Sequence, residues 1–142
     1  MIHYCVGSVF YRDASVALVQ KLNPKWQKGL FNGIGGKIEE GETPLQAMDR
    51  EWNEETGHPA PTWTKFCLLT DFRGWEVHFY TASVEGEDWD MPKENDRGEP
   101  LSWKPVDLYD VPHVSNLEWL IPMALCSDQG KPFLIVEKGG DE

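Results

Sequence analysis

Residues 36–58 read GKIEEGETPLQAMDREWNEETGH, and this stretch determines the expected fold. Thr43 can accept a hydrogen bond from a first-turn amide, and Pro44 suits the first position of a helix. Gln46, three residues after Thr43, completes a capping box. Gly57 is typical of the residue at which a helix ends. The stretch therefore predicts a helix that begins after Thr43 and ends at Gly57.

Three carboxylates share one face of this helix. At 100° per residue, Glu51, Glu54 and Glu55 fall on one stripe. Like charges at these spacings weaken a helix by about 0.2–0.5 kcal/mol per pair, and Arg50 is the nearby cation. Mg²⁺ and Mn²⁺ prefer carboxylate oxygens and retain substrate phosphates among their ligands. The face indicates either a divalent-cation site or the solvated surface of an acidic protein.

A glycine-rich segment precedes the helix. Residues 33–37 read GIGGK, which combines a backbone open to close approach with the cation of Lys37. Such a segment suits a phosphate-bearing ligand, with Gly35 and Lys37 near the phosphates, and it equally suits a tight turn. With the three carboxylates, it could hold a metal ion against a phosphate chain.

The segment from Gly36 to His58 resembles the Nudix box, in which Gly, five residues, Glu and seven residues precede Arg-Glu-apolar-any-Glu-Glu-any-Gly-apolar. Two positions depart from the usual residues: His58 replaces the final apolar residue, and Trp52 is bulkier than the usual aliphatic one. Neither position bears the chemistry, so the departures concern packing. The fixed positions all match, and they are Gly36, Glu42, Arg50, Glu51, Glu54, Glu55 and Gly57.

The resemblance implies an α+β fold, namely an α/β/α sandwich around a mixed β-sheet. It also implies hydrolysis of a nucleoside diphosphate linked to another group. By analogy, Glu51, Glu54, Glu55 and the carbonyl of Gly36 would bind Mg²⁺, which Mn²⁺ can replace. Glu54 or Glu55 is expected to take the proton of the attacking water.

Several further roles follow from the same resemblance. Arg50 and Glu42 are expected to orient the loop and the helix. Lys37 is expected to contact a substrate phosphate, or else to be a solvated lysine. A further metal ligand would come from Glu94 or Glu99, and we favour Glu99 because it shortly precedes the expected strand 101–106.

The expected substrate rests on a wider segment that begins before the box and on a residue pair that follows it. Residues 26–42 and the pair Ser115-Asn116 are similar to MutT-like nucleoside triphosphate pyrophosphohydrolases, which remove oxidised purine nucleotides such as 8-oxo-dGTP. The amide of Asn116 could read a purine edge or cap a helix, and Asn32 could touch the base or sugar or cap a turn. The prediction is cleavage to the monophosphate and pyrophosphate. Dinucleoside polyphosphates, nucleotide sugars and a non-catalytic nucleotide sensor remain alternatives.

The remaining elements fit one domain over residues 1–142. Strand patterns from Val6 to Leu22 predict a hairpin, residues 31–40 a strand leading into a wide loop, and residues 65–84 a second hairpin. Strand 101–106, helix 116–126 and strand 132–136 follow an acidic loop over 85–99. Residues 138–142 are expected to fray.

Composition limits the class of partner. The 142 residues carry a net charge of −11, which disfavours a nucleic-acid duplex and leaves a small nucleotide as the expected ligand. No apolar run approaches the about 20 residues that cross a bilayer, so a cytoplasmic protein without a membrane partner is expected, as monomer or homodimer. The three cysteines are predicted to be buried free thiols, and the scattered histidines predict no zinc site.

Overall fold

The strand at the centre of the fold, β1 (Ile2–Tyr11), pairs with neighbours on both sides in a computed structural model that describes residues 1–85, 90–127 and 132–137. The sheet runs in the order β3-β2-β1-β6-β5-β8, with β4 paired to β1 and β7 paired to β2. β1 and β6 are parallel, as are β5 and β8, whereas the other pairs are antiparallel. The predicted mixed sheet is confirmed. The elements after β1 are β2 (Ser15–Gln20), a 3₁₀ turn (Lys25–Gln27), β3 (Phe31–Asn32), β4 (Ile34–Lys37), α1 (Pro44–Thr56), β5 (Thr64–Thr70), β6 (Trp75–Val84), β7 (Leu101–Pro105), α2 (Leu117–Cys126) and β8 (Phe133–Val136).

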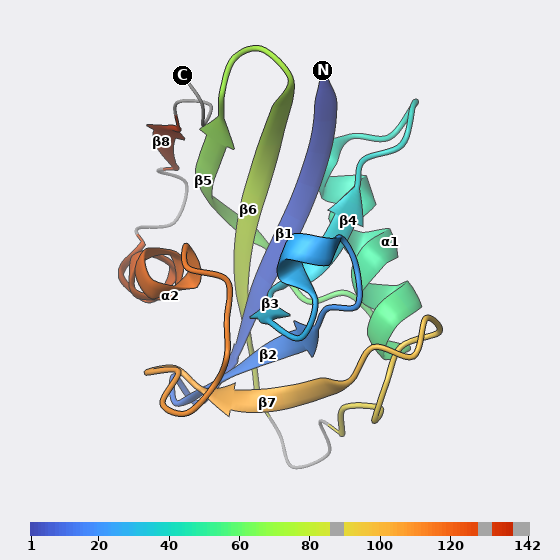
Figure 1. Cartoon of the computed structure of the whole chain (residues 1–142), viewed down its shortest axis with the longest axis vertical. Helices are drawn as coiled ribbons and strands as arrows, with labels where there is room; N and C mark the ends of the chain where they lie inside the picture. Colours follow the sequence, from blue (N-terminus) through green and yellow to red (C-terminus); the bar gives the residue numbers. More distant parts are fainter. Residues whose placement is uncertain (86–89, 128–131, 138–142) are drawn as a thin grey trace.

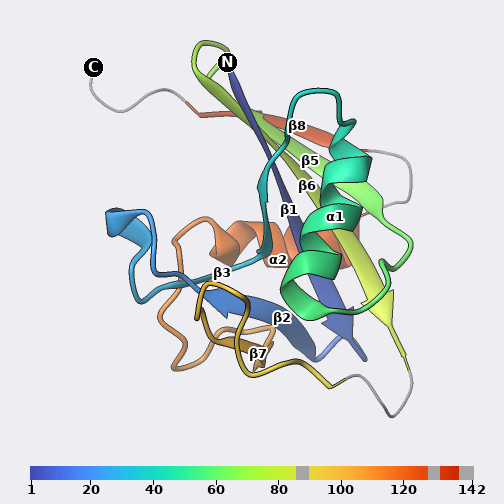
Figure 2. The ribbon, with the colours of Figure 1, turned by 90° about the vertical axis from the view of Figure 1, so that its right-hand side faces the viewer.

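The two helices cover opposite faces of the sheet (Figures 1 and 2). Because side chains alternate along a strand, β1 contributes to a core on each face. Phe10 packs in the cluster that includes the buried side of α2, whereas Cys5 and Val9 pack in clusters that include Met48 and Trp52 of α1. The arrangement is the predicted α+β sandwich.

Local sequence signals set the ends of α1 as predicted. The Thr43 hydroxyl accepts from the Gln46 amide at 3.1 Å, and the Gln46 side chain accepts from the Thr43 amide at 2.9 Å. Gly57 adopts a φ of 75° at the end of the helix and donates its amide to Asn53. Side chains of L-residues rarely adopt that φ, so glycine suits the position.

One prediction about the cysteines is wrong. Cys5 and Cys67 are buried, and burial raises the pKa of their thiols to about 12 and about 11. Cys126 is exposed, because the last residue of α2 lies beyond the helix face that packs on the sheet through Ile121 and Ala124.

The expected frayed segment 138–142 lies outside the described residues. Among the helices of the described residues, none has the length and apolar character needed to span a membrane.

Candidate active site

The glycines of β4 let α1 approach the sheet closely. β4 runs antiparallel to β1 with Gly36 opposite Cys5, which places the Gly36 backbone beneath the helix. A Cβ at Gly36 would lie 2.5 Å from Oε1 of Glu51, and a Cβ at Gly35 would overlap the carbonyl oxygen of Cys5. Glycine at position 35 therefore permits the close pairing of β4 with β1, whereas glycine at position 36 permits the close approach of α1. This approach also buries Glu51, which is 8% exposed, and this burial raises the pKa of its carboxyl.

Arg50 connects the loop before α1 to the acidic face of the helix. It donates to both carboxylate oxygens of Glu42, from Nε at 2.6 Å and from Nη2 at 2.9 Å. Its Nη1 donates to Glu51 at 3.0 Å and to Glu54 at 3.2 Å, and its Nη2 donates to the Lys37 carbonyl at 3.1 Å. The hydrogen bonds from Arg50 and from the Glu39 amide hold the pKa of Glu42 at about 2. The loop and the helix are thus fixed to one another through a single guanidinium.

Glu55 is the most buried carboxylate of the face, with 2% exposure. Its Oε1 accepts from Asn95 at 3.0 Å and from Arg97 at 3.0 Å. Its Oε2 is buried and accepts no hydrogen bond within the described residues. Burial raises the pKa of this carboxyl to about 7, although Asn95 and Arg97 oppose the shift. An oxygen of this kind is where a cation would supply the missing interaction.

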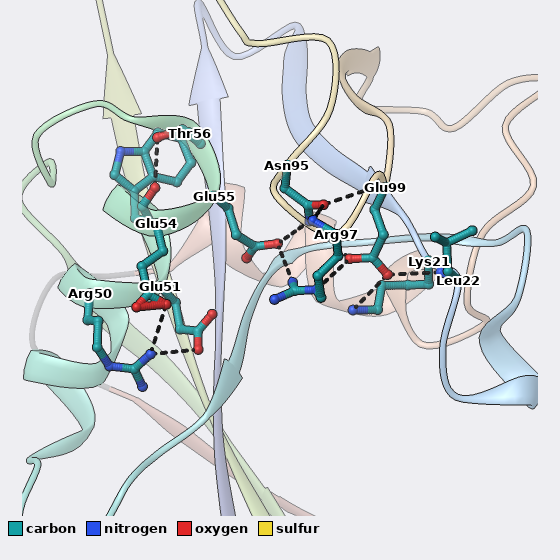
Figure 3. Close-up of polar contacts among 11 residues, drawn as sticks. Lys21, Leu22, Arg50, Glu51, Glu54, Glu55, Thr56, Asn95, Arg97 and Glu99 are labelled. Carbon is teal, nitrogen blue, oxygen red and sulfur yellow. Dashed lines mark hydrogen bonds and ion pairs between the residues drawn. The ribbon is translucent and has the colours of Figure 1, made fainter.

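Glu99, in the loop before β7, contacts the same two side chains as Glu55 (Figure 3). It is 1% exposed, and its Oε1 accepts from Asn95 at 3.0 Å and from Arg97 at 3.3 Å. Its Oε2 accepts from the Leu22 amide at 2.9 Å and lies 3.6 Å from Nζ of Lys21. Glu55 and Glu99 therefore share two donors, although they are far apart in the sequence.

The other candidate of this loop, Glu94, is exposed, and its backbone pairs with that of Pro100. Sequence reasoning missed Asn95 and Arg97. A signal was present, because an Asn two residues before Arg97 and shortly before Gly98 is typical of a side-chain-stabilised turn. Oδ1 of Asn95 does accept from the amides of Arg97 and Glu99, at 3.0 Å and 2.9 Å.

The acidic face of α1 is divided between two arginines. Arg50 holds Glu51 and the half-exposed Glu54, whereas Arg97 holds Glu55. The carboxylate oxygens of this face are groups that could hold a metal ion. Hard divalent cations prefer such oxygens.

The remaining predicted residues lie around the glycine-rich segment and the start of α2. The Asn32 side chain donates to Gln27 at 3.1 Å and accepts from the Gly33 amide at 2.8 Å. Lys37 is exposed. Asn116 precedes the first residue of α2 but makes no side-chain capping bond, and its Oδ1 is buried without a hydrogen-bond partner among the described residues.

Backbone pairing brings the two asparagines into one region. Phe31, beside Asn32, donates its amide to Pro112 at 2.8 Å and accepts from Val114 at 3.1 Å. The segment that leads into Asn116 therefore runs beside β3.

Comparison with known proteins gives matches to a family model and to solved structures. The model described as the NUDIX domain matches residues 1–130. The curated oxidized purine nucleoside triphosphate hydrolase of Danio rerio is 36% identical over 85 residues, which are 56% of this chain and 51% of that protein. The match thus spans about half the length of that relative.

Two solved structures share the fold over most of their length. A MutT protein from Bacillus halodurans has a TM-score of 0.72 and 27% identity, covering 91% of this chain and 85% of that one. The NUDIX domain of NrtR from Shewanella oneidensis, solved with ADP ribose, has a TM-score of 0.73 and 22% identity, covering 88% of this chain and 86% of that one.

Proposed function

Because this chain belongs to the NUDIX domain family, we propose that it is a pyrophosphohydrolase that cleaves a nucleoside triphosphate to the monophosphate and pyrophosphate. The observation that carries the proposal is that Glu55 of α1 shares the donors Asn95 and Arg97 with Glu99, while Glu51 of the same helix lies against the Gly36 backbone. Such a set of oxygens suits phosphoanhydride chemistry, in which positioning and charge stabilisation dominate. Residues 1–142 would form the single domain that carries it.

The residues present fit a hard divalent cation, Mg²⁺ or Mn²⁺. The buried Oε2 of Glu55 lacks a donor, and Glu51 lies against the Gly36 backbone. We assign the ligands to Glu51, Glu54, Glu55, Glu99 and the Gly36 carbonyl. When bound, such an ion supplies charge to the phosphates and lowers the pKa of water.

The chain's own residues have separable roles in this scheme. Glu54 or Glu55 would accept the proton of the attacking water, because a carboxylate within about 3 Å of a water can do so. Arg50 would keep Glu51 and Glu54 in position through its hydrogen bonds to Glu42. Lys37 and the backbone of Gly35 would contact the substrate phosphates.

We propose an oxidised purine nucleoside triphosphate, such as 8-oxo-dGTP, as the substrate. The likeness to the Danio rerio relative, an oxidized purine nucleoside triphosphate hydrolase, supports this class. The buried Oδ1 of Asn116 also supports it, because an unpaired acceptor requires a donor such as a purine N–H. Asn32 lies in β3, which pairs with the segment before Asn116, and it would contact the base or the sugar.

A non-catalytic nucleotide sensor is the second candidate; the NUDIX domain of NrtR, which has a similar fold, was solved with the nucleotide ligand ADP ribose. Dinucleoside polyphosphates and nucleotide sugars are the competing substrates for an enzyme. A panel of these compounds and of normal and oxidised triphosphates, ranked by kcat/KM with Mg²⁺, separates the candidates. Release of monophosphate and pyrophosphate from triphosphates supports the proposal. Release of orthophosphate, or binding without turnover, contradicts it.

A further inference from the structure

A second group of metal-binding side chains lies on the same face of the sheet as α1, near the start of β1. The parallel pairing of β1 and β6 places His3 opposite Glu76, and His78 follows two residues later on the same face. Oε2 of Glu76 lies 2.9 Å from Nδ1 of His3 and 2.7 Å from Nε2 of His78. Two imidazole nitrogens and a carboxylate oxygen thus lie within 4.8 Å of one another.

These side chains line a cavity of about 630 Å³. Its other wall is the end of β4 and the loop that joins it to α1, which can be followed from the β4 label in Figure 1. The charged residues in this loop wall are Lys37, Glu39, Glu40 and Glu42. Together with Glu76, the lining has four carboxylates against the two cations Lys37 and the Met1 amino group, so the cavity attracts cations.

The chemistry of the donors selects the kind of ion. Imidazole nitrogens suit Zn²⁺ and similar borderline ions, whereas Mg²⁺ prefers oxygen ligands. We propose that His3, Glu76 and His78 form a second metal site, which binds Zn²⁺ and leaves the fourth position open toward the cavity. In a tetrahedral zinc site with bonds near 2.05 Å, ligand atoms lie about 3.3 Å apart. Oε2 of Glu76 therefore needs to move away from each imidazole nitrogen by less than about 1 Å, and the two nitrogens, which lie within 4.8 Å of one another, need to come to about the same 3.3 Å separation.

Both ring nitrogens of His78 have close neighbours. The ring is 7% exposed, its Nε2 lies 2.7 Å from Oε2 of Glu76, and Nζ of Lys65 lies 2.6 Å from its Nδ1. Binding of zinc through Nε2 would leave the ring proton on Nδ1, so the Lys65 side chain would have to move away from that nitrogen.

The proposal is independent of the activity proposed above. Its ligands come from β1 and β6, whereas the carboxylates proposed for Mg²⁺ come from α1 and the loop before β7. Glu42 lies between the two sets of ligands, since it lines the cavity and is paired with Arg50, which contacts the α1 carboxylates.

The test is a zinc titration of the full chain, without a histidine tag, against a chromophoric zinc chelator in saturating Mg²⁺. Mg²⁺ in excess competes for the proposed oxygen site, so the zinc that still binds is expected to report on the histidines. We expect one bound Zn²⁺, and His3→Ala and Glu76→Gln to weaken it at least about tenfold. His3 is exposed, so its replacement leaves the fold intact, and thermal unfolding checks this.

Two controls make the result specific. His113→Ala removes a histidine that contacts Val111 and Glu118 elsewhere, and Glu54→Gln alters the proposed Mg²⁺ site. Both variants are expected to bind zinc as the wild type does. Co²⁺ in place of Zn²⁺ is expected to give the visible absorption of tetrahedral cobalt, which His3→Ala should lose. No zinc bound in Mg²⁺, or equal affinity in His3→Ala and Glu76→Gln, overturns the proposal.

Discussion

Nη2 of Arg97 lies 3.0 Å from Oε1 of Glu55 and so ties the loop before β7 to the acidic face of α1. The same guanidinium donates from Nε to Glu99 at 3.3 Å. A half-exposed cation therefore holds two buried carboxylates at the point where we propose a divalent ion.

Replacement of Arg97 by alanine is expected to lower the free energy of unfolding by about 1–2 kcal/mol without Mg²⁺, because two buried carboxylates lose a cationic partner. Saturating Mg²⁺ should recover most of this loss, since the metal ion would supply the missing charge. Urea unfolding in EDTA and in Mg²⁺ measures both values. An equal loss under the two conditions would show that Arg97 does not share these carboxylates with a metal ion.

Gly36→Ala is expected to lower kcat about 100-fold, because its Cβ would lie 2.5 Å from Glu51 and displace a proposed metal ligand. Gly74→Ala is the matched control. A Cβ at Gly74 meets its nearest atom, Oδ2 of Asp71, at 3.7 Å, so its activity should stay within about twofold. Steady-state kinetics with circular dichroism separates loss of chemistry from loss of fold. Equal activities in the two variants would refute the proposed placement of Glu51.

The two acidic candidates of the loop before β7 can be distinguished by their metal dependence. Glu99→Gln is expected to raise the Mg²⁺ concentration that gives half-maximal activity about tenfold, because it removes a buried ligand charge. Glu94→Gln changes an exposed side chain and should leave this concentration unchanged. A shift in the Glu94 variant alone would transfer the ligand role to Glu94.

Asn116→Ala is expected to lower kcat/KM for the preferred purine triphosphate by about 10- to 100-fold, because one hydrogen-bonding pair with the base is worth about 1–3 kcal/mol. The melting temperature should hardly change, since the side chain makes no capping bond. A pyrimidine triphosphate serves as the control substrate and should lose little. Loss of stability without loss of purine preference would favour a structural role for Asn116.

Features that depend on neighbours in the sequence were predictable. The ends of α1 follow from Thr43, Gln46 and Gly57, whose contacts span only a few residues. The box glutamates share a face because the period of the helix fixes it. The second hairpin also has a local cause, since Asp71 accepts from the amides of the turn residues Arg73 and Gly74.

Features that depend on distant contacts were not predictable in the same way. Asn95 and Arg97 reach Glu55 across about 40 positions of chain, and no local pattern fixes how that loop folds back. His3 meets Glu76 and His78 only because β1 and β6 pair in parallel in one register. A register shift by one residue would send these side chains to opposite faces of the sheet.

The turnover of a purine nucleoside triphosphate by Glu54→Gln in saturating Mg²⁺ tests the central claim most directly. The variant keeps the side-chain volume but removes a proposed ligand charge from a carboxylate that is half-exposed, so the fold should be retained. We expect kcat to fall at least about 100-fold, with thermal unfolding unchanged. Turnover at the wild-type rate, yielding monophosphate and pyrophosphate, would contradict the claim that the α1 carboxylates hold the metal ions for hydrolysis.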